Sequence, residues 1–506
     1  MNRIIILVVA VFAMAFCNAQ NSTDGLRYGV DRTYGTARFQ GMSGAFGALG
    51  GDLSAIGINP AGSAVFLQNN ASVSFSVFDR ENDATYFNTE TRSIDTDVSL
   101  NQAGLVFVFD TTNEESPWKK FTLGLNFDSS QNYNDELFVI GTGNTSISEF
   151  FLAQAQGFPL NLLELRPGES IADLYTFLGE TEGVAAQNAF LGYQGFIFDP
   201  VDPNNQNNTQ YTSNVAPGSF NQEYAYFTEG YNGKYTLNLA TQYTNDFFFG
   251  INLNSHVIDY RRSTFLFETN SNTGSSVNQI GFENNLSVLG TGFSAQVGAI
   301  AKLNDKFRLG LTYDTPTWYV ISEETSQALE TRRVENGQNI FETVNPRVIN
   351  VFEDYELRTP GKVMASAAYV FGKSGLISFD YSYKDYSNTK FSPSNDPVFI
   401  GVNSEIDNRL KATSTYRLGG EYRINNMSLR GGYHFEESPY KDETTVGDLN
   451  GFSLGAGYNF GNYTFDVAYA RSEQSREQQL YNVGLTDSAS IETTYSTVVF
   501  TLGFRL

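Results

Sequence analysis

Few side chains of this sequence have both the chemistry and the spacing of a catalytic site. The two histidines, His256 and His434, fall among the polar residues of alternating segments, whereas a hydrolase needs a histidine beside a serine and an acid. No His-Glu-x-x-His pair and no phosphate-binding glycine motif is present. The sequence therefore predicts no enzyme: no catalytic residue, no metal site and no cofactor.

Residues 1–19 have the composition of a cleaved signal peptide. Arg3 supplies the positive charge, and the apolar run that follows it is too short to span a bilayer. Cys17 is the single cysteine, and Phe16 before it is too bulky for a lipid-attachment signal. We expect cleavage after Ala19, which would leave a chain without a disulfide or a thiolate ligand.

Short and long connections alternate along the rest of the chain. Long polar stretches such as 79–102, 134–230 and 472–492 are separated by tight turns. Outer-membrane β-barrels have this asymmetry, with short periplasmic turns and long extracellular loops. We place the six tight turns at 110–119, 243–247, 303–306, 372–375, 424–427 and 459–462.

The segments between these turns alternate polar and apolar residues with a period of two. In the last one, Val498, Phe500, Leu502 and Phe504 share one face, and Thr497 and Thr501 share the other. Fourteen such segments are present, which makes a barrel too wide for its own side chains to fill. The prediction is an all-β, 14-stranded antiparallel transmembrane β-barrel over residues 70–506, polar inside and surrounded by outer-membrane lipid.

The charge balance limits the partners of this protein. The formal net charge is −23, from 55 acidic and 32 basic residues. Nucleic acid binding requires basic patches, so we expect no nucleic acid partner. A barrel in the outer membrane of a Gram-negative bacterium would meet the barrel-assembly machinery during its biogenesis.

Residues 20–69 precede the first expected strand and are predicted to form a plug, or hatch, inside the lumen. The stretch 35–62 is rich in glycine and alanine and nearly uncharged. Small residues let a backbone pack closely against barrel walls. A flexible periplasmic tail, the alternative, would be more polar.

The same stretch resembles the N-terminal hatch of the FadL/TodX family of outer-membrane transporters for long-chain fatty acids and other hydrophobic compounds. The resemblance extends to the strand number, the long insertion after strand three, and the Thr-Pro pairs at 315–316 and 359–360, near the mouths of strands seven and eight. It rests on Gly41-Met42-x-Gly44-Ala45-Phe46, Asp52-x-Ser54-Ala55 and Asn59-Pro60-Ala61-Gly62.

This resemblance implies a route for an apolar ligand. Family members pass ligands from an extracellular groove to a lumenal pocket and release them sideways at a kink in the third strand, while the hatch blocks axial diffusion. Gly41, Met42, Gly44, Ala45 and Phe46 would lie against the pocket, and Asn59 to Gly62 would be hatch positions. No proline marks a kink in residues 121–133.

The extracellular insertion, about 134–230, has partly helical apolar spacing. Its apolar residues either pack on one another to close the barrel top or cover a ligand. For a ligand groove the candidates are Phe150, Phe151, Leu162 and Leu163, and Arg38 beside the hatch is a candidate partner for a ligand carboxylate.

Three hypotheses follow for function. The leading one is an uptake channel for hydrophobic small molecules such as long-chain fatty acids, with extracellular capture, lumenal binding and lateral release past the hatch. The second is a surface docking or secretion-associated barrel that binds other proteins through the insertion. The third, a barrel hydrolase, would need His256 or His434 in a serine–histidine–acid cluster.

Overall fold

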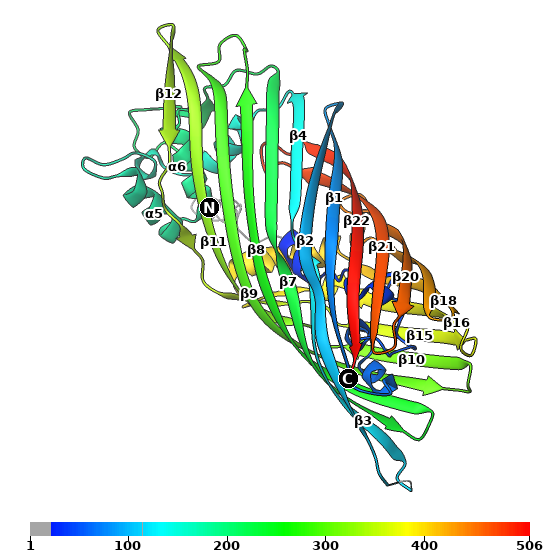
Figure 1. The fold of residues 1–506 in the computed structure, drawn as a ribbon. Helices are drawn as coiled ribbons and strands as arrows, with labels where there is room; N and C mark the ends of the chain where they lie inside the picture. The colour runs from blue at the N-terminus through cyan, green and yellow to red at the C-terminus, as the bar shows by residue number, and fades with distance from the viewer. Residues whose placement is uncertain (1–21, 114) are drawn as a thin grey trace.

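The computed structural model describes residues 22–113 and 115–506, so the expected signal peptide lies outside the described residues. Antiparallel strands close into one barrel with fourteen wall positions, as the alternation predicted (Figure 1). Three of these positions are each built from two consecutive strand segments, since the third, β3, continues along β7 as β4 (Asp135–Gly143). In wall order the strands are β1 (Asn70–Tyr86), β2 (Thr89–Asp110), β3 (Trp118–Asn132), β7 (Phe220–Tyr243), β8 (Phe247–Thr269), β9 (Val277–Lys302), β10 (Phe307–Asp314) with β11 (Trp318–Glu335), β14 (Tyr355–Arg358) with β15 (Lys362–Val370), β16 (Gly375–Asp385), β18 (Ala412–Ile424), β19 (Met427–Glu436), β20 (Leu449–Asn459), β21 (Tyr463–Gln479) and β22 (Ser488–Arg505).

The remaining elements belong to the lumen and to the extracellular side. The lumen holds α2 (Ser22–Gly29), α3 (Ala37–Gln40), η1 (Ser54–Gly57) and η2 (Pro60–Val65). Among the described helices, none is long and apolar enough to cross a membrane. The other elements are α4 (Ser148–Ala155), η3 (Leu160–Leu162), α5 (Ile171–Thr181), α6 (Val184–Gln194), β5 (Phe198–Pro200), β6 (Tyr211–Ser213), β12 (Gln338–Val344), β13 (Asn350–Val351), η4 (Tyr386–Asn388), β17 (Lys390–Ser392) and α7 (Pro397–Arg409).

The barrel closes where its first strand meets its last. β1 pairs with β22 over sixteen consecutive residue pairs, from Asn70↔Arg505 to Thr85↔Ser490. All six tight turns fall between paired strands at the rim where β1 begins and β22 ends. Both ends of the barrel sequence therefore lie on the periplasmic side, as an even strand number requires.

The two faces of the wall have the predicted chemistry. Phe500, Leu502 and Phe504 are each more than 40% exposed, while Val499 and Thr501 are buried. An exposed apolar side chain on a barrel wall faces lipid, so the apolar phase points outward and the polar phase points into the lumen. Exposed aromatic residues also gather close to the tight turns, as in an interfacial girdle: Trp118, Tyr243, Phe247, Phe307, Phe371, Tyr458, Phe460 and Tyr463.

Several of the predicted long loops are strand instead. Residues 79–102 continue β1 and β2 into a long hairpin that turns at Phe87 and Asn88, both with positive φ. Most of 472–492 likewise extends β21 and β22. The far ends of these extensions rise above the bilayer, where both faces of a strand can be polar, so period-two alternation is lost there although the ladder persists.

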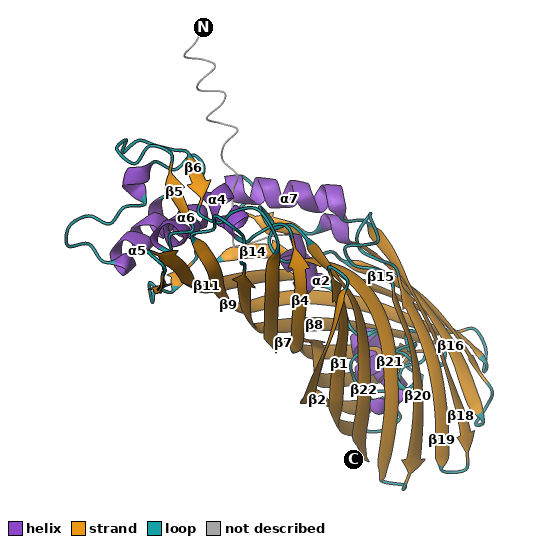
Figure 2. Cartoon of the chain, turned by 90° about the horizontal axis from the view of Figure 1, so that it is seen from above, coloured by secondary structure: helices purple, strands orange, loops and turns teal. Residues whose placement is uncertain are grey.

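A cap of helices covers the extracellular end (Figure 2). Helices α4, α5 and α6 pack with the tops of the strands around one apolar core, which includes Ile147, Phe190 and Phe282. Helix α7 lies beside this cap and closes another part of the opening. The lumen is thus bounded by the cap above and the hatch below.

Candidate functional site

The hatch is a compact set of short turns that fills the lumen between the wall strands. Helix α3 begins at Thr36, whose side chain accepts from the Phe39 N–H and donates to the Asp52 carboxylate at 2.8 Å. Met42, Ala45 and Phe46 of the predicted signature are fully buried. The glycine and alanine content that suggested a plug therefore serves close packing inside a narrow space.

Asn59 holds the second half of the hatch in place. Its side chain accepts from the Ala61 N–H and so begins η2, in which Pro60 occupies the first turn. The same amide group donates to the Gly47 carbonyl at 2.7 Å within the hatch and to the Ala299 carbonyl at 3.1 Å on β9. One buried residue thus joins a helix cap, a hatch cross-link and a wall contact, which explains why asparagine stands here.

Glycines on the inner face of the wall make room for the hatch, and the sequence analysis did not identify them. A Cβ at Gly298 would lie 2.1 Å from the Asn59 Oδ1, and one at Gly310 would lie 2.2 Å from the Gly47 carbonyl oxygen. In the sequence these glycines fall among the polar, lumen-facing residues of the alternating strands, and this position is the feature that could have identified them. The wall glycines that meet the hatch are Gly124, Gly250, Gly298, Gly310, Gly419, Gly432 and Gly455.

Polar side chains of the wall fix the hatch from many directions. Asp380 accepts from the Gly47 N–H at 2.9 Å, and Thr501 accepts from the Ala37 N–H at 2.7 Å. Further wall side chains that bond to the hatch are Asn101, Lys120, Thr122, Asn126, Asn238, Asn252, Gln296 and Ser453. Residues 35–66 are therefore held around the whole circumference of the barrel.

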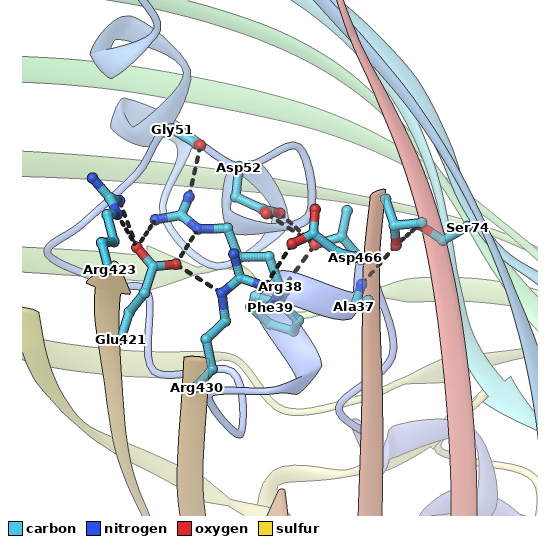
Figure 3. A network of polar contacts seen from close by, with 12 residues as sticks. Ala37, Arg38, Phe39, Gly51, Asp52, Ser74, Glu421, Arg423, Arg430 and Asp466 are labelled. Atoms are coloured by element: carbon cyan, nitrogen blue, oxygen red, sulfur yellow. Dashed lines mark hydrogen bonds and ion pairs between the residues drawn. The ribbon is translucent and has the colours of Figure 1, made fainter. Parts of the chain in front are cut away.

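Arg38 belongs to an ion network at the periplasmic side of the hatch (Figure 3). Its Nε donates to Glu421 at 2.8 Å and its Nη1 donates to the Gly51 carbonyl at 3.0 Å. Glu421 also accepts from Arg430, which in turn reaches Asp466 at 2.6 Å. The guanidinium predicted to meet a ligand carboxylate is thus engaged by the protein, and it borders a cavity of about 710 Å3 below the hatch.

The predicted groove residues of the insertion lie inside the cap. Phe150, Phe151 and Leu163 are buried within the cap core, and Leu162 is partly buried against it. The Phe151 ring packs edge-on against Phe282 of β9 at 4.9 Å between centroids. In this conformation these residues pack on one another and close the barrel top, which is the arrangement of the alternative, and the ligand groove stays a prediction.

The upper lumen is occupied by the N-terminal segment. Leu26 and Tyr28 are buried in an apolar cluster with the wall and with α7. The cluster members from the wall and from α7 include Ile258, Tyr260, Val288, Tyr319, Leu357, Phe399 and Ile406. Below the cluster and above the hatch lies a polar cavity of about 110 Å3.

The charged groups around this cavity meet at Asp31. Its Oδ2 lies 3.0 Å from the Lys362 Nζ on β15 and 3.2 Å from the Lys384 Nζ on β16. Burial alone would raise the pKa of Asp31, but the two ammonium groups outweigh it and hold the pKa of this carboxyl well below its usual range. No pattern in the sequence had singled out these lysines.

The third wall position is interrupted beside the same cavity. β3 pairs with β2 only up to Gln102↔Asp128, and above that pair β2 continues against β1. Ser130 is the extra residue of a bulge between Ser129 and Gln131, after which the chain pairs with β7. The separation is bridged by side chains, with Asn132 donating to Asp97 at 2.9 Å. A bulge therefore interrupts this strand without proline, and an inserted residue of this kind bends and twists a strand locally.

The two Thr-Pro pairs mark a second irregularity of the wall. Thr315-Pro316 separates β10 from β11, and Thr359-Pro360 separates β14 from β15. Paired residues flank both breaks, Asp314↔Lys362 on one side and Trp318↔Arg358 on the other. The pairs therefore lie within the wall beside the cavity, and not at the strand mouths where the sequence placed them, because proline cannot continue a ladder.

The histidines face the lumen, as their phase predicted. The His256 Nε2 is 2.8 Å from the Ser294 Oγ, but its Nδ1 is buried and has no hydrogen-bond partner among the described residues. A triad requires an acid on that nitrogen, so the pair does not form one. His434 lines a smaller cavity of about 60 Å3. Within residues 22–113 and 115–506 no group of three His, Cys, Asp or Glu side chains could hold a metal.

Comparisons with known proteins agree with this geometry. The toluene transporter TodX of P. putida is 12% identical with a TM-score of 0.54, over 94% of this chain and 99% of that chain. A Pseudomonas aeruginosa FadL homologue is 14% identical with a TM-score of 0.52, over 94% and 98%. At such identities these structures show a shared fold. No curated protein sequence matches the chain.

A match to a protein-family model shows the family membership that structural similarity at 12–14% identity does not show. The model described as "Outer membrane protein transport protein (OMPP1/FadL/TodX)" matches residues 208–506, more than half of the chain. The closed barrel and its hatch have the architecture that this membership implies. The chain therefore belongs to the FadL/TodX family of outer-membrane transporters of hydrophobic compounds, located in the outer membrane of Gram-negative bacteria.

Proposed function

We propose that this protein takes up hydrophobic small molecules such as long-chain fatty acids and releases them sideways into the membrane. The observation that carries the proposal is the separation of β2 from β3 beside the lumenal cavity. Asp128, Ser129 and Ser130 line that cavity, and they stand where β3 loses its partner. A ligand in the cavity would face a stretch of the wall where β2 and β3 share no main-chain ladder.

The surroundings of the separation support a lateral exit. The outward residues at its level, Ile94, Val98 and Leu100, are apolar and exposed, as expected for positions in lipid. The axial route is filled by residues 35–66 and their wall contacts. Moving apolar surface into lipid yields about 25 cal/mol per Å2, so release would need no energy source within the barrel.

Capture would take place in the cap. Phe150, Phe151, Leu162 and Leu163 stand over the upper lumen and would contact a ligand only after the cap helices move. The ligand would then replace contacts that these side chains now make with one another. This arrangement assigns the insertion a gating role as well as a binding role.

Deletion of Ser130 tests the exit. Because Ser129 pairs with Gly233 and Gln131 pairs with Asn232, removing the bulged residue restores a regular ladder with β7 and favours pairing with β2. Uptake of radiolabelled hexadecanoate by cells should fall at least tenfold, while the barrel keeps its heat-modifiable migration on gels.

The same strand offers a matched control. Lys119 is the extra residue of a second shift, between Trp118 and Lys120 at the periplasmic turn, and deleting it should leave uptake unchanged. Wild-type uptake by the Ser130 deletion would contradict lateral release at this point. A fall with both deletions would indicate general damage to the strand and would also count against it.

A docking function is favoured by one observation. Phe341 on β12 and Val351 on β13 are each about 70% exposed, and both strands pair with the extracellular part of β11. Exposed apolar residues clear of lipid suit a protein partner. Replacing both by serine should abolish partner binding without changing uptake if docking is a separate activity.

A further inference from the structure

A cavity of about 710 Å3 lies below the hatch at the periplasmic end of the barrel, and we call it the periplasmic vestibule. Its roof is formed by hatch residues 49–53 and 65–66. Its sides come from β10, β15, β16 and β18 to β22, and from the start of β1. Residues of three tight turns, Gly372, Asn425 and Asn459, also line it, so the vestibule opens toward the periplasm.

The charged side chains of the vestibule carry an excess of positive charge. Its lining includes five guanidinium groups, from Arg38, Arg308, Arg423, Arg430 and Arg505, and no lysine. It includes three carboxylates, from Asp52, Glu421 and Asp466. Five against three leaves a formal charge of +2, in a chain whose net charge is −23. Guanidinium groups bind carboxylates through paired, charge-assisted hydrogen bonds, so this lining favours an anionic occupant.

The three carboxylates of the vestibule are already engaged by the protein. Glu421 accepts from three of the arginines at 2.8, 2.7 and 2.8 Å, and Asp466 accepts from Arg430 at 2.6 Å (Figure 3). Asp52 accepts from the Thr36 hydroxyl within the hatch at 2.8 Å. These acids therefore balance the arginines that they contact and leave the others uncompensated.

Arg308 and Arg505 are the two guanidinium groups outside this network. The Arg308 Nη1 donates to the Leu49 carbonyl at 3.2 Å, and the Arg505 Nη1 donates to the Gly461 carbonyl at 3.0 Å. Neither forms an ion pair within residues 22–113 and 115–506, in contrast to Arg38 and the other vestibule arginines. A guanidinium group has five N–H donors, so both retain donors for an anion.

The lining also has an apolar part. Leu67 lies between η2 and β1 inside the vestibule, where it is 84% exposed to water instead of lipid. The other apolar side chains of the lining include Leu49, Val65, Phe66, Val370 and Leu376. A small inorganic anion would leave these side chains uncovered. A chain segment that carries both carboxylates and an apolar residue would match both parts of the lining.

We propose that the periplasmic vestibule is a docking site for a short acidic segment of a periplasmic protein. Carboxylates of the segment pair with Arg308 and Arg505, and an apolar residue of the segment covers Leu67. Pockets of about 300–1,000 Å3 hold small ligands, so a cavity of about 710 Å3 admits a short peptide segment but not a folded domain. This docking goes beyond the uptake function proposed above and does not depend on it.

Peptide binding tests the charge complementarity. The probe is a fluorescein-labelled peptide of the sequence Asp-Leu-Glu-Asp-Leu-Glu, and the comparison peptide has Asn and Gln in place of the acids. Fluorescence anisotropy with the full barrel in nanodiscs of uncharged lipid should show at least tenfold tighter binding of the acidic peptide. Added salt should weaken this binding, because it screens the charges.

Variants of the lining test the site itself. Arg308→Gln with Arg505→Gln should weaken binding of the acidic peptide at least tenfold, and Leu67→Ser should weaken it several-fold. The matched control is Lys306→Gln with Lys373→Gln, which makes the same charge change in two exposed tight turns outside the lining and should bind as the wild type does. Arg505→Gln alone should also weaken binding, and its side chain bonds to a turn and not to the hatch.

Photo-crosslinking in cells identifies the occupant. The photoreactive residue p-benzoylphenylalanine placed at Leu67 should crosslink a periplasmic protein, and mass spectrometry should locate the crosslink in a segment rich in Asp and Glu. This product should disappear when Arg308→Gln and Arg505→Gln are added. The same label at Leu303, which is 62% exposed in a tight turn outside the lining, is the control and should not give this product.

Several outcomes would overturn the docking site. Equal binding of the two peptides would do so, as would wild-type binding by the double arginine variant. A missing crosslink, or a crosslinked segment without carboxylates, would also count against it. If inorganic phosphate binds with a dependence on both arginines and the acidic peptide does not, the vestibule is a small-anion site.

Two features of the design keep these outcomes interpretable. Heat-modifiable migration of every variant confirms a folded barrel before any binding is compared. None of the measurements uses a hydrophobic ligand, so failure of the uptake function would leave the result for the vestibule unchanged.

Discussion

Replacing Asn59 by alanine should loosen the hatch without disturbing the barrel. The substitution removes three hydrogen bonds: those to the Gly47 and Ala299 carbonyls and the one from the Ala61 N–H. At about 1 kcal/mol for each lost hydrogen bond, the closed hatch loses about 3 kcal/mol. Since about 1.4 kcal/mol corresponds to a factor of ten, the open population should rise by about 100-fold.

Planar bilayer recordings measure this effect directly. The fraction of time that single Asn59→Ala barrels spend in a conducting state should exceed that of the wild type by about two orders of magnitude. Hydrogen exchange supplies a second readout, because backbone amides of residues 59–66 should exchange faster while those of β9 keep their protection. Asn304→Ala is the control, since Asn304 accepts from two backbone amides in an exposed turn.

The reasoning is refuted by a specific pair of results. If the variant conducts no more often than the wild type and the amides of residues 59–66 keep their protection, the Asn59 hydrogen bonds do not hold the hatch. Conduction with unchanged protection would place the opening in another part of the lumen. Either result would show that the hydrogen bonds of Asn59 are not what keeps the hatch closed.

Three further changes test the wall, the lipid face and the cap. Gly298→Ala should also raise conductance, because its Cβ would meet the Asn59 Oδ1 at 2.1 Å, whereas Gly420→Ala, which meets nothing closer than 3.7 Å, should not. Phe500→Arg should cost about 2–4 kcal/mol and reduce heat-modifiable barrel in membranes, while Phe341→Arg above the bilayer should be tolerated. Phe151→Ala should destabilise the cap by about 3–5 kcal/mol and make it sensitive to external protease, and an unchanged digestion pattern would argue against a packed cap.

The sequence predicted those features that follow from local pattern. Alternation along the last strand put Phe500 and Thr501 on opposite faces, and the strand number, which makes the barrel too wide to fill with its own side chains, assigned Phe500 to lipid and Thr501 to the lumen. The tight turns were equally visible, since a turn is set by a few adjacent residues. The hatch signature was readable because Asn59 and Pro60 specify a helix start wherever they occur.

Features that depend on distant pairing could not be predicted in this way. Asp31 and Lys362 are separated by 331 positions, and nothing near either residue indicates the other. The spacing of Phe150 and Phe151 suits a ligand groove and a packed cap equally well. Their packing depends on residues distant in the sequence, such as Phe282, which local spacing does not reveal. The bulge of the third strand came from an extra serine, Ser130, which looks like any other polar residue in the sequence.

The position of the hatch directly before β1 dictates the order in which this protein can assemble. The hatch bonds to β2, where Asn101 donates to the Gly35 carbonyl, and to the last strand through Ala37 and Thr501, so it contacts wall segments from both halves of the chain. Once β1 has paired with β22, the wall is continuous and the cap covers the top, so a folded hatch would have to enter from the periplasmic end and pass the wall side chains that bond to it. The open sheet must therefore gather around the hatch before the final seam forms. Each barrel therefore closes around the hatch of its own chain during insertion. A hatch peptide supplied separately should not enter a finished barrel.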